Sequence, residues 1–370
     1  MKIVTCKINE MVQTLRNDRI ILFGVGEFYR NYVAVKFPVE LIENVIYAVD
    51  NCEEYHEALL GQKKIPVYQP EILMEERDCT ILLTSTMVMY DMYLQLESMK
   101  LPDDIKCGAI PFMFAESVGK TDDNLCSKIL NKKKNLRINK TIHSFWFSGD
   151  KKPNVYQECI NSWHKVCPDY DIKEWNLKNY DVHKNSFMEQ AVEKKKWAFV
   201  SDYARLDVIY QYGGIYMDMD MELRKPLDIL LGNKAFFSFD MLNDIDLAAF
   251  GAEPGLPLLK ELMNLYENVE FTGDGRSMNY FCQPRYIRPV LEKTGVMLNG
   301  NMQYIDEMIF LPRNYLSPKD MVVYEMAVAS NATIGVHHFN AGWKEGDYLS
   351  QRLLKNRKLE QVFGNEEAEF

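Results

Sequence analysis

The chain has 370 residues, of which 47% are apolar and 26% are charged. This composition is typical of a folded globular protein, and the length predicts two domains. A net charge of −10 argues against a nucleic-acid-binding protein, which normally carries a basic face. That charge does not exclude a nucleotide ligand, because a metal ion can supply the positive charge that a diphosphate needs.

Eight cysteines are present and none forms a Cys-x-x-Cys pair, so we expect buried, reduced thiols. The N-terminal segment has no apolar signal core, and no window approaches about 18 uninterrupted apolar residues. The sequence therefore predicts a cytoplasmic protein with no transmembrane segment. Peripheral attachment at the inner face of the membrane is left open.

Residues 1–117 are expected to form an N-terminal Rossmann-like domain of the α/β class. Continuous apolar strands separated by helical segments predict a parallel sheet that is covered on both faces. The strands are expected within residues 19–30, 44–51, 79–86 and 105–114.

Gly24, Gly26 and Asp50 form a candidate nucleotide site in this domain, because a glycine turn and a following acid resemble a dinucleotide fingerprint. Tyr29 stands where the third glycine would be. Three interpretations stay open: nicotinamide binding, binding of another nucleotide or nucleotide-sugar, and a structural or interaction role. The pattern over about 110 residues is similar to the small Rossmann-like domain that is attached to many bacterial sugar-modifying enzymes.

Residues 118–137 are polar, include the run 132–134 of three lysines, and are expected to form a linker. A contact with anionic lipid or a lipid-diphosphate acceptor is the alternative. Residues 138–370 are expected to form a second α/β domain. Its pattern predicts, in chain order, a strand (140–149), a helix (153–170), a strand (171–175), a helix (197–214) and a strand (215–220).

Asp218 and Asp220 lie two residues apart in the strand-like segment IYMDMD. Alternation predicts that both carboxylates point away from the core, about 6.6 Å apart along the strand. One can bind a divalent metal while the other holds a ribose hydroxyl or a metal-bound water. Oxygen ligands select Mg²⁺ or Mn²⁺, which would hold a diphosphate.

The spacing Asp-x-Asp also occurs at residues 169–171 and 244–246, so the context of Asp218 carries the argument rather than the spacing. Asp202 and Arg205 lie three apart on the preceding helix and therefore on one face. A surface ion pair is the alternative to a role near a diphosphate.

Four motifs in residues 140–345 resemble glycosyltransferase family 32 and occur in the order found there: KTIHSFWFSG, CINSWHKVCPDYDIKEWN, KKWAFVSDYARLDVIYQYGGIYMDMDMELRKPLD and IGVHHFNAGW. The resemblance implies a GT-A fold, a UDP- or GDP-sugar donor, manganese or magnesium, and retention of the anomeric configuration. It also implies a glycan or lipid-linked oligosaccharide as acceptor, as in bacterial capsular polysaccharide biosynthesis.

The resemblance assigns roles to individual residues. It implies that Trp146 stacks on the donor base and that Asp202 and Arg205 grip the donor sugar and diphosphate. Asp218 and Asp220 match the metal-binding pair, with Asp220 the direct ligand, and His337 resembles a late residue that reaches the metal. Trp343 is placed near the leaving phosphate, and Tyr216 is a candidate donor contact.

Three other functions stay open. One is a nucleotide-sugar-binding or scaffold protein with a degenerate transferase domain. Another is an oxidoreductase that uses Gly24, Gly26 and Asp50. The third is a metal-dependent phosphohydrolase that uses the Asp218 and Asp220 pair.

Overall fold

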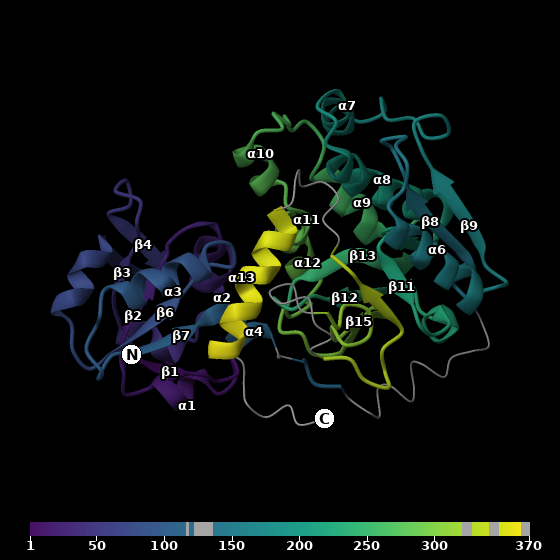
Figure 1. Ribbon diagram of the computed structural model, residues 1–370. Coiled ribbons are helices and arrows are strands. Elements are labelled where there is room, and N and C mark those ends of the chain that lie inside the picture. Colours follow the sequence, from purple (N-terminus) through teal and green to yellow (C-terminus); the bar gives the residue numbers. More distant parts are fainter. Residues whose placement is uncertain (116–117, 122–135, 320–327, 340–347, 364–370) are drawn as a thin grey trace. The chain divides into compact units, whose positions relative to one another are not determined.

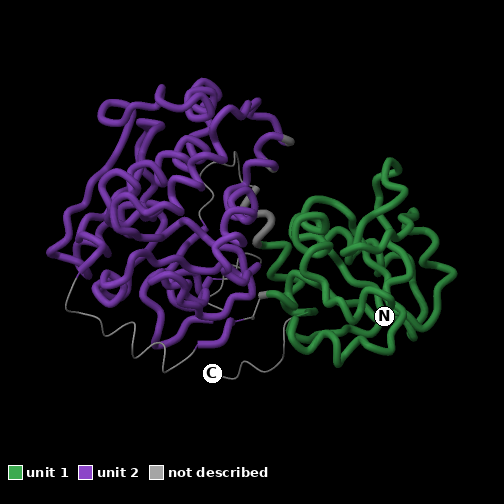
Figure 2. The backbone as a smooth tube through the Cα atoms, turned by 180° about the vertical axis from the view of Figure 1, so that it is seen from behind, with its two compact units in different colours: residues 1–117, 320–325, 345–370 green, residues 118–319, 326–344 purple. Residues whose placement is uncertain are grey.

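The computed structural model describes residues 1–115, 118–121, 136–319, 328–339 and 348–363. The chain divides into two compact units, drawn in green and purple in Figure 2. Unit 1 comprises residues 1–117, 320–325 and 345–370, and unit 2 comprises residues 118–319 and 326–344.

Unit 1 contains a seven-stranded sheet in the order β1-β7-β6-β2-β3-β5-β4 (Figure 1). All neighbouring pairs are parallel except the edge pair of β5 and β4. The strands are β1 (Lys2–Val4), β2 (Arg19–Phe23), β3 (Val45–Val49), β4 (Glu57–Leu60), β5 (Lys63–Tyr68), β6 (Cys79–Leu83) and β7 (Lys106–Ala109). The helical segments are α1 (Met11–Leu15), the π-helix η1 (Tyr29–Val33), α2 (Ala34–Lys36), the 3-10 helices η2 (Val39–Asn44) and η3 (Pro70–Glu75), α3 (Met89–Ser98), α4 (Ile110–Ala115) and α13 (Tyr348–Phe363).

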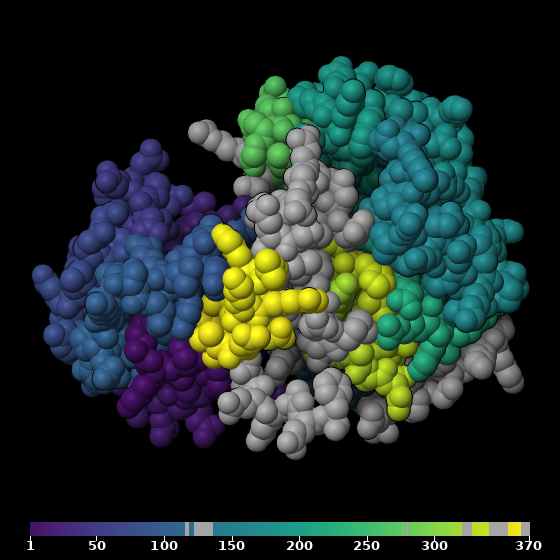
Figure 3. Space-filling model, viewed as in Figure 1, coloured from purple at the N-terminus to yellow at the C-terminus, as the bar shows by residue number. Residues whose placement is uncertain are grey.

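The C-terminal helix α13 differs from the predicted division, in which the second domain ran to residue 370. Its Phe363 is buried and packs edge-on against Tyr93 of α3, with ring centroids 5.5 Å apart. Lys355 Nζ lies 2.9 Å from the Asp91 carboxylate, also on α3. The yellow atoms of α13 accordingly lie against the blue atoms of α3 in Figure 3. Burial of these apolar side chains places the helix in unit 1 although it follows unit 2 in the chain.

Unit 2 contains a mixed seven-stranded sheet in the order β14-β15-β12-β13-β10-β8-β9, and a two-stranded ribbon of β11 and β16. The strands are β8 (Thr141–Phe145), β9 (Asp171–Trp175), β10 (Gly214–Met217), β11 (Met221–Leu223), β12 (Ala235–Phe239), β13 (Ile245–Ala252), β14 (Gln303–Ile305), β15 (Met308–Leu311) and β16 (Gly335–His337). The helices are α6 (Asn154–Val166), α7 (Ser186–Glu193), α8 (Trp197–Tyr212), the 3-10 helix η4 (Leu227–Leu230), α9 (Pro257–Asn264), α10 (Gly275–Tyr280), α11 (Gln283–Tyr286) and α12 (Arg288–Lys293).

The central sheet of unit 2 is apolar on both faces. Along β10, Tyr216 joins the core cluster on the side of α7, α8 and α9, whereas Ile215 and Met217 join the cluster that includes Trp163 of α6. This is the alternation that a strand imposes on its side chains. The α/β class predicted from the sequence is confirmed, and the mixed sheet is consistent with the expected GT-A-like fold.

The seven cysteines within the described residues form no disulfide, as expected. Among the described residues, no helix combines the length and the apolar character that crossing a membrane requires. Residues 118–121 of the expected linker are described and belong to unit 2, where Lys120 N donates to Asn301 Oδ1 over 2.7 Å. Residues 122–135 lie outside the described part of the chain.

Candidate functional site

A glycine pair connects helix α8 to strand β10 and so determines where the site begins. Gly213 and Gly214 have φ angles of +66° and +96°. A Cβ on Gly214 would lie 2.7 Å from the Thr141 carbonyl oxygen of β8. Only glycine adopts this conformation at such close approach without strain. The chain therefore turns directly from the helix into the strand that leads to Asp218.

The predicted strand over residues 215–220 is wrong at its end, because β10 stops at Met217. Asp218 and Asp220 lie in a tight turn, which Met221 N closes by donating to the Asp218 carbonyl over 3.0 Å. The two carboxylates are therefore not spread along a pleat. One ligand atom each of Asp218, Asp220 and His337 lies within 4.8 Å of the others. The turn thus produces the close acidic pair that an extended strand would have prevented.

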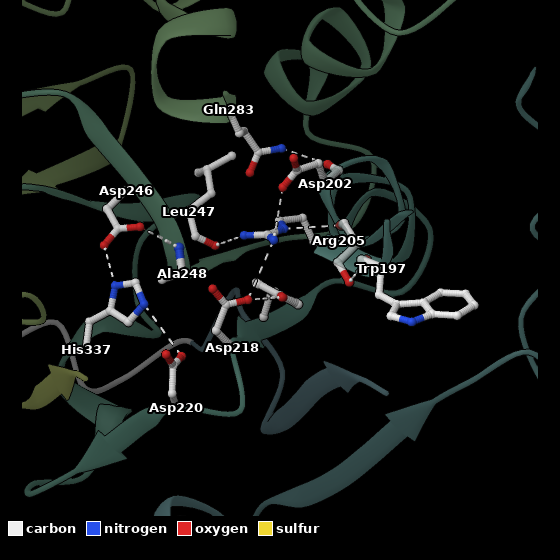
Figure 4. Close-up of polar contacts among 12 residues, drawn as sticks. Trp197, Asp202, Arg205, Asp218, Asp220, Asp246, Leu247, Ala248, Gln283 and His337 are labelled. Carbon is white, nitrogen blue, oxygen red and sulfur yellow. Dashed lines mark hydrogen bonds and ion pairs between the residues drawn. The ribbon is translucent and has the colours of Figure 1, made fainter. Parts of the chain in front are cut away.

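Helix α8 is buried over most of its circumference and carries Asp202 and Arg205 into the interior. Arg205 is 7% exposed, and its Nη2 lies 3.1 Å from Asp202 Oδ1 and 3.6 Å from Asp218 Oδ1. Its Nη1 donates to the Leu247 carbonyl over 3.0 Å, and its Nε donates to the Ser201 carbonyl over 3.1 Å (Figure 4). The alternative of a surface ion pair does not apply, because the guanidinium is buried and held in one orientation.

Tyr216 completes this part of the site from strand β10. Its ring is buried, its hydroxyl donates to Asp218 Oδ1, and the Arg205 guanidinium carbon lies 4.6 Å from its ring centroid. The Tyr216 hydroxyl proton is therefore engaged with Asp218, and donating it to a sugar donor would require this hydrogen bond to rearrange.

His337 reaches the acidic pair from strand β16, which pairs with β11 so that Met221 lies opposite it. The Nε2 atom of His337 is 3.5 Å from Asp220 Oδ1, and its Nδ1 is 3.0 Å from Asp246 Oδ2. Figure 4 shows the imidazole ring between these two carboxylates. The neighbouring His338 contacts Glu222 instead, over 3.0 Å.

Burial and neighbouring charges shift the ionisation of these groups in different directions. Burial raises the pKa of Asp202 to about 7, although Arg205 lowers it. Burial also raises the pKa of Asp218, again against the effect of Arg205. Burial alone would lower the pKa of His337, but Asp246 and Asp220 together raise it well above its usual value. A cation that binds His337 must therefore displace a proton from Nε2.

The residues present fit a divalent cation. Two carboxylates and one imidazole converge within one coordination sphere, and two of the three are anionic ligands of the kind that Mn²⁺ and Mg²⁺ accept. A cation there would also offset the mutual repulsion of two carboxylates that are largely removed from water. His337 and Asp220 would be ligands, with Asp218 beside them and tied to Arg205.

Other sequence-predicted residues lie elsewhere. Trp146 follows β8, is half-buried, and donates from Nε1 to the Asp150 carbonyl over 2.7 Å. Its ring packs edge-on against Tyr156, with centroids 5.6 Å apart, and Lys152 Nζ lies over the ring at 5.8 Å from its centroid. Trp343 lies outside the described residues.

The glycine turn of unit 1 brings Gly24, Gly26 and Asp50 together. Asp50 Oδ2 accepts from Val25 N over 2.7 Å, and its Oδ1 accepts from Cys52 N over 2.9 Å. Tyr29, in place of the third glycine, is buried and donates to the Leu59 carbonyl over 2.9 Å. Asp50 thus holds the glycine turn through Oδ2, while its Oδ1 accepts from the backbone that follows Asp50 itself.

Two contributors to the site were not predicted from the sequence. Asp246 contacts His337, and Gln283 donates to the Asp202 carbonyl over 2.8 Å and to the Tyr266 hydroxyl over 3.1 Å. The third Asp-x-Asp spacing was the available signal for Asp246. No local signal marks Gln283, because 81 residues separate it from Asp202.

Residues 153–237, which include the Asp218 turn, match the family described as the glycosyltransferase sugar-binding region containing the DXD motif. The chain is 28% identical over 141 residues to inositol phosphoceramide mannosyltransferase 1 of Schizosaccharomyces pombe, covering 35% of this chain and 42% of that protein. It is 30% identical over 110 residues to an uncharacterized glycosyltransferase of Acanthamoeba polyphaga mimivirus, covering 28% and 44%. The matched segments therefore span less than half of either relative.

Two solved structures show weaker similarity. The PaToxG glycosyltransferase has a TM-score of 0.36 at 13% identity, covering 64% of this chain and 92% of that one. A glycosyltransferase involved in glycosylation of the major capsid of PBCV-1 has a TM-score of 0.30 at 11% identity, covering 60% and 98%. The sequence matches support a glycosyltransferase of the kind that the motifs resemble.

Proposed function

We propose that this protein is a metal-dependent, retaining glycosyltransferase that moves a sugar from a UDP- or GDP-sugar to a hydroxyl of a glycan or lipid-linked acceptor. The observation that carries the proposal is the convergence of Asp218, Asp220 and His337 beside the buried Arg205. The match of residues 153–237 to a DXD-containing sugar-binding region supports it. Bacterial surface polysaccharide synthesis is the setting that we propose.

Donor binding is assigned to groups that already have fixed orientations. Arg205 is anchored by two backbone carbonyls and needs little reorganisation to present positive charge to a diphosphate. A divalent cation held by Asp218, Asp220 and His337, the acidic cluster, would neutralise further negative charge as the diphosphate leaves. In this proposal the Asp202 carboxylate, on the same buried helix, accepts hydrogen bonds from sugar hydroxyls.

Retention of configuration follows from front-face attack in this proposal. The acceptor hydroxyl attacks on the face from which the diphosphate departs, and a diphosphate oxygen accepts its proton. Trp146 would stack on the donor base, since its ring is half-buried rather than enclosed in the core.

Donor hydrolysis measured with a panel of UDP- and GDP-sugars and Mn²⁺ tests the proposal. Asp218→Asn and Asp220→Asn are expected to lose at least about 100-fold in rate with an unchanged fold. Asp171→Asn is the matched control, because Asp171 belongs to another Asp-x-Asp pair and lies exposed at the start of β9. Wild-type rates of donor hydrolysis in both Asp218→Asn and Asp220→Asn would reject these two residues as the metal-binding pair.

A further inference from the structure

Three consecutive residues of strand β13 contact three different parts of the acidic site. Asp246 accepts from His337, the Leu247 carbonyl accepts from Arg205, and the Ala248 carbonyl accepts from Asp218 N over 2.7 Å. Figure 4 shows these residues along one side of the site. One short stretch of chain therefore sets the positions of a histidine, a guanidinium and an aspartate relative to each other.

This stretch lies in an irregular part of the sheet. Between β12 and β13 the register pairs Phe236 with Gly251 but Ser238 with Asp246. Four residues of β13 (247–250) therefore lie opposite the single residue Phe237 of β12, so β13 has three additional residues there. Irregularities of this kind redirect side chains and occur beside active sites. Two of these residues contact the site: the Leu247 carbonyl accepts from Arg205, and Ala248 N donates to Asp246 Oδ1.

We propose that Asp246 is a positioning residue that holds His337 with its Nε2 directed at the cation site between Asp220 and Asp218. The inference deepens the proposed function and rests on it, because it takes that cluster as a divalent-cation site. Asp246 would not contact the cation or the donor. Its effect would pass through the orientation and tautomer of one ring.

The contacts of Asp246 carry the inference. Its Oδ1 accepts from Ala248 N over 2.9 Å, so the carboxylate is fixed to the strand. Its Oδ2 lies 3.0 Å from His337 Nδ1 and 3.5 Å from Ser317 Oγ. A carboxylate accepts hydrogen bonds, so Nδ1 keeps its proton against Asp246, and Nε2 is the nitrogen that can bind a cation after giving up its own proton. A carboxylate behind a metal-binding histidine also makes that histidine a stronger ligand.

The adjacent His338 provides an internal comparison. Its Nε2 lies 3.0 Å from Glu222 Oε2, at the same separation as the pair of His337 and Asp246. The acidic cluster found among the described residues does not include His338 or Glu222. Glu222→Gln therefore removes a histidine-paired carboxylate next to the site without touching the proposed ligand.

The experiment measures binding of Mn²⁺ alone to the full chain by the electron paramagnetic resonance signal of free Mn²⁺. Pulsed measurements on the bound ion then report whether a histidine nitrogen is coordinated. The variants are Asp246→Asn, Glu222→Gln, His337→Gln and Asp220→Asn, with thermal unfolding as a check that each one folds. If Asp246→Asn does not fold, Asp246→Ser replaces it, because the smaller side chain leaves room for water.

We expect Asp246→Asn to weaken Mn²⁺ binding roughly 10- to 100-fold and to reduce the nitrogen coupling, whereas Glu222→Gln changes neither. His337→Gln should abolish the coupling. Wild-type affinity with full nitrogen coupling in Asp246→Asn would overturn the inference alone. Unchanged Mn²⁺ binding in Asp220→Asn and His337→Gln, or no binding by the wild type, would overturn the cation site and with it the proposed function.

Discussion

Arg205 is the residue whose replacement tests the buried charge network most directly. Arg205→Met keeps much of the side-chain length and removes the guanidinium. Two backbone carbonyls, of Ser201 and Leu247, then lose their donor, and Asp202 loses its ionic partner at 3.1 Å. Removing one member of a buried ion pair costs about 3–5 kcal/mol of unfolding free energy.

The low end of that range, about 3 kcal/mol, is expected here. Burial already raises the pKa of Asp202 to about 7, so the orphaned carboxyl can become protonated instead of remaining charged. The loss should therefore be smaller at pH 5.5 than at pH 8. The double variant Arg205→Met with Asp202→Asn should lose less unfolding free energy than the sum of the two single variants' losses. The difference should be at least about 1 kcal/mol, because the two groups are in contact.

Urea unfolding followed by tryptophan fluorescence measures the unfolding free energy of unit 2 alone. All five tryptophans lie at or after residue 146, and none falls in the segments that form unit 1. The signal therefore reports unit 2, which avoids combining two transitions in one curve. A loss below 1 kcal/mol in Arg205→Met, or strict additivity with Asp202→Asn, would refute the account of a buried, mutually dependent pair.

Three further changes test the scaffold of the site. Burial lowers the pKa of His143 to about 4, so the unfolded chain takes up a proton on this histidine at a higher pH than the folded chain does. The free energy of unfolding of unit 2 should therefore fall by up to about 3 kcal/mol as the pH falls from 6.5 to 4. His143→Gln should flatten that pH dependence in the fluorescence-detected unfolding, and a slope equal to wild type would contradict it. Gly214→Ala should cost about 2 kcal/mol or more in urea unfolding, because φ is +96° and the new Cβ meets the Thr141 carbonyl at 2.7 Å. Gly255→Ala is the control, because Gly255 has a φ of +73° but no atom lies within 4 Å of an added Cβ. It should lose only about 1 kcal/mol of unfolding free energy, from backbone strain. Equal losses in the two variants would refute the steric argument. Trp163→Phe should cost about 1–3 kcal/mol, because the indole donates to the buried Met221 carbonyl over 2.6 Å. An unchanged unfolding midpoint there would exclude that bond as a support of the turn.

The amino-acid sequence determined the features that depend on local pattern. Apolar runs and glycine turns located four parallel strands of unit 1 (β2, β3, β6 and β7) but missed β1 and β5. Helical periodicity placed Asp202 and Arg205 on one helix ahead of Asp218. These predictions succeed because strand and helix periods act over a few residues. The same alternation rule failed at Asp218 and Asp220, because a tight turn follows Met217 and strand geometry no longer applies there.

Only the tertiary structure decided which distant residues support the site. The resemblance pointed to His337 but not to Asp246, which lies 91 residues from it. The pairing of β16 with β11 brings His337 to the turn of Asp218 and Asp220. Gln283 of α11 donates a hydrogen bond to the Asp202 carbonyl. Helix α13 belongs to unit 1, although unit 2 lies between it and the rest of unit 1 in the sequence. Such contacts depend on long-range strand register and on burial of apolar faces, which act between segments far apart in the chain and leave no periodic trace near the residues themselves.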